Sequence, residues 1–157
     1  MEGVAIVLVV GLGIDRAWLA PRRAEGVEWL FYDGSCGLCH RTIRLALAAA
    51  PDDKGLLFAP LASAAFKAAV PGDLKLPDSL IYVTADGAVL SRTAAVIRLL
   101  DRLGGRWRIA AGVLRVVPKP IRDIGYDAVA AIRHRVFARP SDACPLIPPD
   151  QRDRFVN

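Results

Sequence analysis

The sequence is poor in cysteine, histidine and methionine. Its 157 residues include three cysteines, two histidines and one methionine. Three cysteines are too few for the disulfide framework of a small secreted protein, and an odd number leaves one of them unpaired. These counts exclude a fold held together by several disulfides. We therefore expect a reducing compartment, the cytoplasm.

The sequence also lacks an apolar run long enough to cross a membrane. The longest run, residues 3–14, has 12 residues, whereas a spanning helix needs about 20. Glu2 precedes the run and arginines follow it, which reverses the charge order of a secretory signal. We expect residues 1–26 to form an apolar N-terminal extension, and we do not favour membrane association or export.

Acidic residues are scarce in the C-terminal part. Up to residue 91 there are 8 Lys and Arg against 10 Asp and Glu, whereas from residue 92 onward there are 13 against 6. No basic patch interleaved with aromatic residues accompanies this excess, so nucleic acid is not indicated as a partner. The length and the 54% of hydrophobic residues predict one domain with a sizeable core.

The residues that carry chemistry lie in FYDGSCGLCH, residues 31–40. The aromatic-rich run 27–32 predicts a buried strand, and the Asp-Gly pair after it predicts a turn. A helix then begins, with Ser35 as its expected N-cap and Pro51 as its stop. The sequence therefore predicts two cysteines, two residues apart, in the first turns of a helix.

This position predicts a redox dithiol made of Cys36 and Cys39. Free backbone amides and the helix dipole stabilise an anion at the first turn, so Cys36 should ionise easily, while Cys39 should stay a thiol until needed. Cys36 would attack a disulfide and Cys39 would resolve the mixed disulfide. Asp33, three residues before Cys36, either moves a proton from Cys39 or stabilises the turn, and both interpretations stay open.

The remaining pattern predicts an α/β fold. The expected order after the first strand and helix is strand, short helix, two strands joined by a hairpin, and a helix capped by Thr93. This is the order of a thioredoxin-like mixed four-stranded sheet flanked by helices. We expect this domain to occupy residues 27–139, with two additional C-terminal helices at 107–117 and 121–138, before an irregular tail at 140–157.

The last predicted helix carries apolar residues at helical spacing, and we expect that face to pack on the domain. Arg122, Arg133 and Arg135 lie off this stripe, so we interpret them as a solvated basic face. An acidic protein partner or a membrane surface is the less favoured alternative. The stripe consists of Ile121, Ile124, Ala128, Val129, Ile132 and Val136.

These residues resemble a known family. The segment YDGSCGLC is similar to the signature of the DCC family of thiol-disulfide oxidoreductases, named for an Asp, Cys, Cys triplet that would here be Asp33, Cys36 and Cys39. Segments such as RTIRLAL and DSLIYVTADGAVLSRTAAVIRLLDRLGG are also similar in kind and order to family segments. The resemblance implies a thioredoxin-like fold and protein-disulfide oxidoreductase activity, with a protein disulfide or a low-molecular-weight thiol as partner.

Three further residues are weaker candidates. Thioredoxin-like proteins place a cis-proline before the third strand of this order, and Pro77 lies near that point, although a turn proline explains it equally well. Tyr32 could border the site, although a core position is favoured. Cys144 could act as a third redox thiol, but an isolated cysteine is more often a free buried thiol.

Two rival functions use the same cysteines. Zinc could be held by Cys36, Cys39 and Cys144 with His40 or His134. These residue types are suitable zinc ligands, but the sequence lacks the second pair of closely spaced ligands that is typical of zinc-binding modules. The same motif, ending in His40, also matches the CxxCH pattern of a c-type haem attachment site. The predicted strands on either side, however, are not expected in an all-helical cytochrome. A nonenzymatic protein-interaction module that keeps the fold and uses Cys36, Cys39 and Cys144 is a further alternative, which the presence of both motif cysteines disfavours. We favour the dithiol, which requires no bound cofactor.

Overall fold

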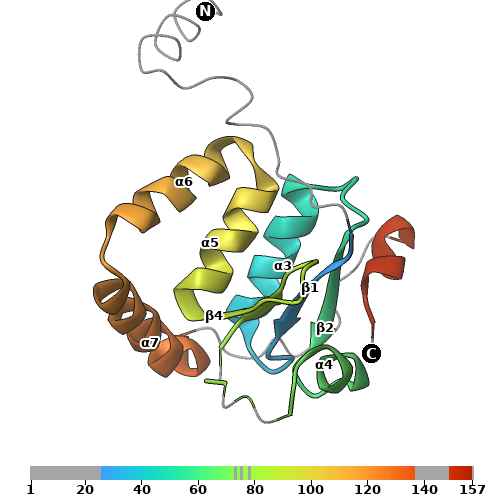
Figure 1. Cartoon of the computed structure of the whole chain (residues 1–157), viewed down its shortest axis with the longest axis horizontal. Coiled ribbons are helices and arrows are strands. Elements are labelled where there is room, and N and C mark those ends of the chain that lie inside the picture. Colours follow the sequence, from blue (N-terminus) through green and yellow to red (C-terminus); the bar gives the residue numbers. More distant parts are fainter. Residues whose placement is uncertain (1–25, 73, 75, 78, 137–148, 157) are drawn as a thin grey trace, which may run out of the picture.

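The computed structural model describes residues 26–72, 74, 76–77, 79–136 and 149–156. Figure 1 shows the arrangement of the elements. In chain order they are β1 (Glu28–Tyr32), α3 (Gly37–Ala49), β2 (Leu56–Pro60), α4 (Ala64–Ala69), β3 (Ile81–Val83), β4 (Val89–Ser91), α5 (Arg92–Leu103), α6 (Gly105–Val116), α7 (Lys119–Val136) and the 3-10 helix η1 (Pro149–Arg154).

The four strands form one mixed sheet in the order β2-β1-β3-β4. β1 pairs with β2 in parallel, and the intervening α3 provides the crossover that a parallel pair requires. β3 pairs antiparallel with both β1 and β4. The predicted thioredoxin-like fold is confirmed: a mixed sheet flanked by helices, followed by C-terminal helices.

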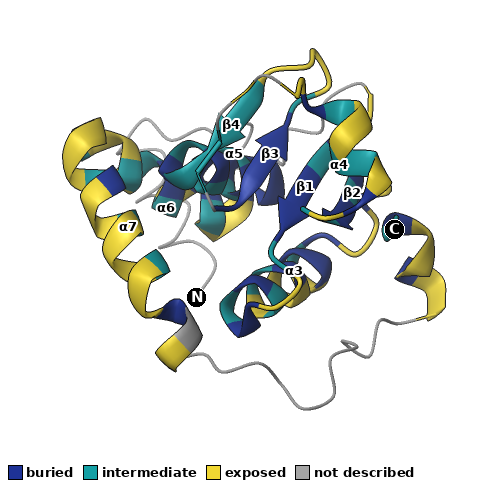
Figure 2. Cartoon of the chain, turned by 90° about the horizontal axis from the view of Figure 1, so that it is seen from below, coloured by how far each residue is buried: buried dark blue, intermediate teal, exposed yellow. Residues whose placement is uncertain are grey.

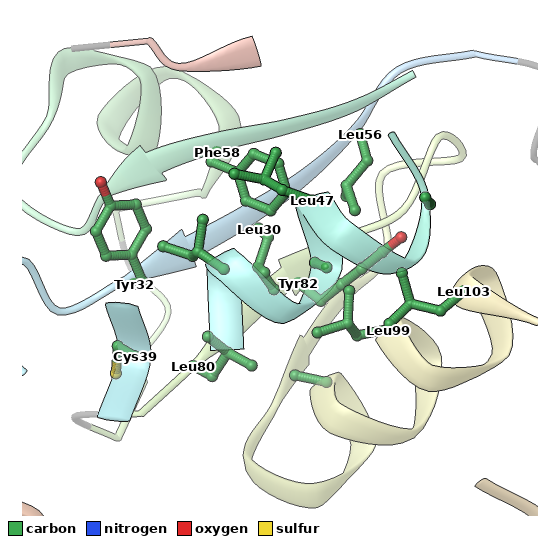
Figure 3. Packing of buried hydrophobic residues seen from close by; sticks show 14 of the residues in the cluster. Leu30, Tyr32, Cys39, Leu47, Leu56, Phe58, Leu80, Tyr82, Leu99 and Leu103 are labelled. Carbon is green, nitrogen blue, oxygen red and sulfur yellow. The ribbon is translucent and has the colours of Figure 1, made fainter. Parts of the chain in front are cut away.

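The sheet separates two apolar layers because successive residues of a strand point to opposite faces. On one face Leu30 and Tyr82 pack with residues of α3 and α5, and Figure 3 shows this cluster from close by. On the other face Phe31 and Ile81 pack with residues of α4, including Phe66. The α3 face holds the larger cluster and also contains both cysteines of the motif.

A buried ionic network lies within this core, at the first residue of β1. Glu28 accepts hydrogen bonds from the Tyr82 hydroxyl at 2.5 Å and from both Arg98 and Arg102. Arg102 also donates two hydrogen bonds to Asp53, at 2.6 and 2.8 Å. Glu28 and Arg102 are almost completely buried. Buried charges are tolerated where each has partners, and this network provides them.

The structure corrects two expectations about helix faces. The apolar stripe of α7 does not pack on the domain, because Ile121, Ile124 and Val136 are each more than 60% exposed. Asp123 and Arg133, from the polar side, are buried instead. The exposed side of α7 is yellow along most of its length in Figure 2. Spacing identified which apolar residues share a face, but it assigned the wrong face to the interior.

Thr93 also differs from its expected role. α5 begins at Arg92, two residues before the start of a helix capped by Thr93, and its N-cap Ser91 makes no side-chain capping hydrogen bond. The Thr93 hydroxyl instead donates to Asp123 of α7, so that it links the two helices. The helix was predicted correctly, whereas its cap was wrong.

Part of the C-terminal tail packs against β2. Within residues 140–157, η1 is followed by Phe155, which pairs with Phe58 in a parallel bridge and stacks on its ring. Arg154 is buried and donates to the backbone carbonyls of Ala50 and Leu56, at 3.1 and 3.2 Å. No helix among the described residues is long and apolar enough to cross a membrane.

Candidate functional site

The two cysteines of the motif lie where β1 gives way to α3. Cys36 is the N-cap of α3, and its sulfur accepts a hydrogen bond from the backbone N–H of Cys39 at 3.4 Å. The Cys36 N–H in turn donates to the Asp33 carbonyl at 3.1 Å. A sulfur in the N-cap position meets the unpaired amides of the first helical turn, which favour negative charge.

Ser35 does not cap the helix, contrary to the sequence-based expectation. Its backbone N–H and its hydroxyl both donate to the Asp33 carboxylate, at 2.8 and 2.6 Å. The carboxylate therefore closes the turn that leads into α3. Because Ser35 is held in this turn, the N-cap position falls on Cys36 itself.

Both cysteines are free thiols, and both are buried. Cys36 has no exposed surface and Cys39 is 7% exposed. A partner molecule can therefore reach the Cys36 sulfur only when the groups around it move. Figure 3 shows Cys39 at one end of the apolar cluster, below Tyr32.

The Cys39 thiol is strongly held in its protonated form. Burial and, after it, the neighbouring Cys36 side chain raise the pKa of Cys39 to about 12, against the opposing effects of Asp33 and Arg133. Burial disfavours the charged form of a thiol, while a nearby cation favours it. Because the effects that raise this pKa outweigh those that lower it, Cys39 is a protonated thiol at neutral pH and must lose its proton before it can react as a thiolate.

Helix α7 brings two side chains to this site that the sequence analysis did not select. Arg133 is 3% exposed, and one guanidinium nitrogen lies 3.4 Å from the second carboxylate oxygen of Asp33. Tyr126 accepts a hydrogen bond from the Leu80 N–H at 2.9 Å. Burial raises the pKa of Tyr126, and its interaction with Cys39 adds to that rise.

A signal for these residues was present in the sequence. Asp123, Tyr126 and Arg133 are three and seven residues apart, which places them on one side of a helix. They form the polar complement of the apolar stripe, and we had interpreted Arg133 as part of a solvated face. The interpretation failed because periodicity groups residues by helix face but does not show which face meets the domain when hydrogen bonds and ion pairs hold the helix.

The other candidates lie in different settings. Tyr32, the last residue of β1, is buried in the α3 layer, and its ring meets the ring of His40 edge to face at 5.8 Å between centroids. The His40 ring donates through Nε2 to the Gly34 carbonyl at 3.0 Å. These contacts hold the turn before α3 against the end of β1.

Pro77 lines a cleft of about 400 Å³ together with Phe66 and Ile81, which belong to the α4 layer. No peptide bond among the described residues is cis, including the one before Pro77. Leu80, just before β3, lies in the same apolar cluster as the cysteines. Cys144 lies outside the described residues.

No three His, Cys, Asp or Glu side chains among the described residues lie close enough together to hold a metal ion. The proposed zinc ligand set includes Cys144, so the structure does not test it. Within the described part of the site, Asp33, Tyr126 and Arg133 are polar side chains that lie beside the dithiol or act on it electrostatically.

The residues of this site lie in a part of the chain that matches a known protein family. The model of the DCC1-like thiol-disulfide oxidoreductases matches residues 30–139, which is 110 of the 157 residues. The uncharacterized protein YuxK of Bacillus subtilis (strain 168) is 32% identical over 133 residues, covering 81% of this chain and 92% of that protein. No solved structure matches significantly. The matched range contains both buried cysteines and Arg133.

Proposed function

Because this chain belongs to the family of DCC1-like thiol-disulfide oxidoreductases, we propose that it is a protein-disulfide reductase that acts through Cys36 and Cys39. Its substrate would be a protein disulfide or a low-molecular-weight disulfide. The observation that carries the proposal is the N-cap position of Cys36, whose sulfur accepts the Cys39 N–H. This hydrogen bond and the free amides of the helix start place donors at the sulfur that would attack the substrate, where negative charge develops.

The proposed cycle has two exchange steps. The Cys36 thiolate attacks one sulfur of the substrate disulfide, forms a mixed disulfide and releases the other sulfur as a thiolate, which takes up a proton. Cys39 then attacks the Cys36 sulfur, and its own proton ends on the second substrate thiol. The substrate gains two electrons and two protons in all, while the Cys36–Cys39 pair is oxidised to a disulfide.

An external dithiol, or two monothiols, would return the pair to its reduced form by the reverse exchange. No bound cofactor takes part, because both electrons come from the sulfur pair. The small number of cysteines in the chain supports a reducing compartment, such as the cytoplasm, as the place of this reaction. In that setting the enzyme would act as a reductant of its partner.

Asp33 has two roles in this proposal. Its carboxylate fixes the turn through Ser35, and the same carboxylate faces Arg133. A bare carboxylate beside the thiols would oppose ionisation, and the guanidinium of Arg133 offsets that effect. We therefore favour Asp33 as part of a paired group that organises the site.

A glutathione redox titration of the purified protein, followed by alkylation and mass spectrometry, tests the proposal. We expect a reversible disulfide between Cys36 and Cys39. The Cys39→Ser variant should trap glutathione on Cys36, and the Cys36→Ser variant should form neither product. The matched control is Cys144→Ser, which should titrate like the parent protein if the first two cysteines suffice.

Three outcomes would contradict this proposal. The absence of a Cys36–Cys39 disulfide at any glutathione ratio would reject the dithiol. Thiols that become reactive only after a chelator is added, together with stoichiometric zinc, would favour the zinc site that includes Cys144. Loss of the titration in Cys144→Ser would assign the resolving role to the third cysteine.

A further inference from the structure

We propose that Arg133 of α7 is a positioning residue for the dithiol and stabilises the negative charge that develops on Cys39 as it resolves the mixed disulfide. This inference rests on the proposed function. It makes α7, which lies beyond the four strands and α5, a part of the redox site. The argument starts from the way in which α7 is attached.

Helix α7 turns its polar side inward. Its attachments to the domain are hydrogen bonds and ion pairs, while most of its large apolar side chains face solvent. Burial of those side chains would each contribute roughly 1.5–3 kcal/mol, so packing alone favours the opposite orientation. The attachments include Thr93 to Asp123, Leu80 to Tyr126, Arg92 to Asp127, Arg122 to Leu114 and Arg133 to Asp33. The orientation that is observed delivers Arg133 and Tyr126 to the cysteines.

Asp33 connects Arg133 to both thiols. One carboxylate oxygen binds Ser35 and the other faces the Arg133 guanidinium. The backbone of Asp33 accepts the Cys36 N–H, and a further backbone hydrogen bond from Asp33 lowers the pKa of Cys39. A change in the position or charge of Arg133 therefore acts on the segment that holds both sulfurs.

The charges that face Cys39 come from three elements. On α3 the Cys36 sulfur opposes ionisation of Cys39, and on α7 the Tyr126 hydroxyl is electrostatically coupled to it. The turn after β1 contributes Asp33, and α7 contributes Arg133, whose positive charge lowers the pKa of Cys39. Removal of the guanidinium would leave a thiol that ionises even less readily, next to a carboxylate that has lost this cation.

The resolving step needs this help. Cys39 must lose its proton as its sulfur bonds to Cys36, while the Cys36–substrate bond breaks and the departing substrate sulfur takes up a proton. Negative charge passes through a buried sulfur during this exchange. A fixed cation close to that sulfur stabilises the developing charge, since it needs no reorganisation at the moment of reaction.

The experiment compares Arg133→Met, Arg133→Lys and the control Arg135→Met, an exposed arginine of the same helix. The direct readout is the pH dependence of Cys39 alkylation in a Cys36→Ser background, which requires no turnover. Because the Arg133 charge favours the thiolate, Arg133→Met should raise the pKa of Cys39 by about one unit or more, a tenfold loss of thiolate at fixed pH. Arg133→Lys should restore most of it, and Arg135→Met should match the parent.

With both cysteines present, the lifetime of the glutathione mixed disulfide on Cys36 gives a second readout. Arg133→Met should lengthen this lifetime by about tenfold if thiolate supply limits resolution. Unfolding in urea shows whether the variants are folded. If Arg133→Met is not, the neutral variant Arg133→Gln, which keeps hydrogen-bond donors, serves as the test.

An unchanged alkylation profile in folded Arg133→Met or Arg133→Gln would overturn the inference and leave Arg133 as a link between helices. Equal shifts in Arg133→Met and Arg135→Met would also overturn it, since a general loss of positive charge would then explain the effect. Failure of the parent protein to form the Cys36–Cys39 disulfide would reject the proposed function. The alkylation profile separates that failure from the role of Arg133, because it reports the Cys39 thiol itself.

Discussion

Two carboxylate–arginine pairs mark the two ends of β1. Glu28, the first residue of the strand, pairs with Arg102 of α5, and Asp33, which directly follows the strand, pairs with Arg133 of α7. In both pairs a carboxylate at a strand end meets a guanidinium from a later helix. The pairs differ in how completely partner side chains enclose their charges, and this difference separates a structural role from a chemical one.

We call the Glu28 pair closed because both of its side chains are buried and each binds a further side chain. Arg102 bridges Glu28 and Asp53, and Tyr82 and Arg98 also donate to Glu28. The Asp33 pair is more open: the Asp33 carboxylate faces Arg133 at 3.4 Å and accepts from Ser35, and its side chain is 19% exposed. The charges of the closed network act on one another within the core, whereas the charge of Arg133 also acts on the Cys39 thiol.

The largest expected effect comes from breaking the closed network. Arg102→Met leaves Glu28 and Asp53 with fewer partners in the core, and loss of one member of a buried ion pair costs about 3–5 kcal/mol. We expect this loss in the free energy of unfolding measured in urea. Lys54→Met, which removes the exposed pair with Asp153, is the control and should change little. A small effect of Arg102→Met would show that solvent or neighbouring groups replace the lost partner.

The pH dependence of that loss sharpens the comparison. Burial acts to raise the pKa of Glu28 and of Asp53, but hydrogen bonds and the Arg102 charge outweigh it and hold both values below normal. Their contribution to stability is therefore present above the unfolded-state pKa values, near 4, and is lost as pH falls through the lower folded-state values. In Arg102→Met, burial should instead raise these pKa values, so that protonation relieves the penalty.

We expect the stability difference between parent and Arg102→Met to shrink as pH falls from 7 to about 4. Urea unfolding at several pH values in this range measures it. A difference that stays constant would mean that the carboxylates keep their low pKa values without Arg102, and would assign the network's stability to the remaining partners.

The smallest effect concerns the polar attachment of α7 at the other end of the strand. Tyr126→Phe removes the hydroxyl that accepts the Leu80 N–H, and an unsatisfied buried donor costs about 1–3 kcal/mol. Hydrogen exchange of the Leu80 amide should accelerate, with a modest loss of overall stability. Ile124→Ser, on the exposed stripe of the same helix, should stay within about 0.5 kcal/mol of the parent. A larger loss in Ile124→Ser would show that the stripe is covered in solution.

The sequence predicted the parts of the fold that depend on local signals. The aromatic run before Asp33, the turn and the helix that ends before Pro51 are all present, because strand, turn and helix signals lie next to one another in the chain. The order of strands and helices followed from the same kind of signal. The predicted N-cap of α3 was wrong because the Ser35 side chain could bind either the first amides of the helix or the Asp33 carboxylate. It binds the carboxylate.

The rest depends on pairings between distant residues. Asp33 and Arg133 are 100 residues apart, and Glu28 and Arg102 are 74 apart. Periodicity locates such residues on a helix face but does not name the partner. For α7, a hydrophobicity argument also selects the wrong side, since the inward side is held by polar contacts that only the folded arrangement reveals.

The pairing of Phe155 with Phe58 bears on self-association. β2 is an edge strand, and its unpaired backbone groups are a template for strands of other chains. The Val156 N–H donates a hydrogen bond to the Phe58 carbonyl at 3.0 Å. The C-terminal residues therefore shield part of that edge within the molecule. At the opposite edge, β4 has only three residues and offers little backbone for such pairing. Truncation before Phe155 would uncover β2 and open this edge to intermolecular strand addition.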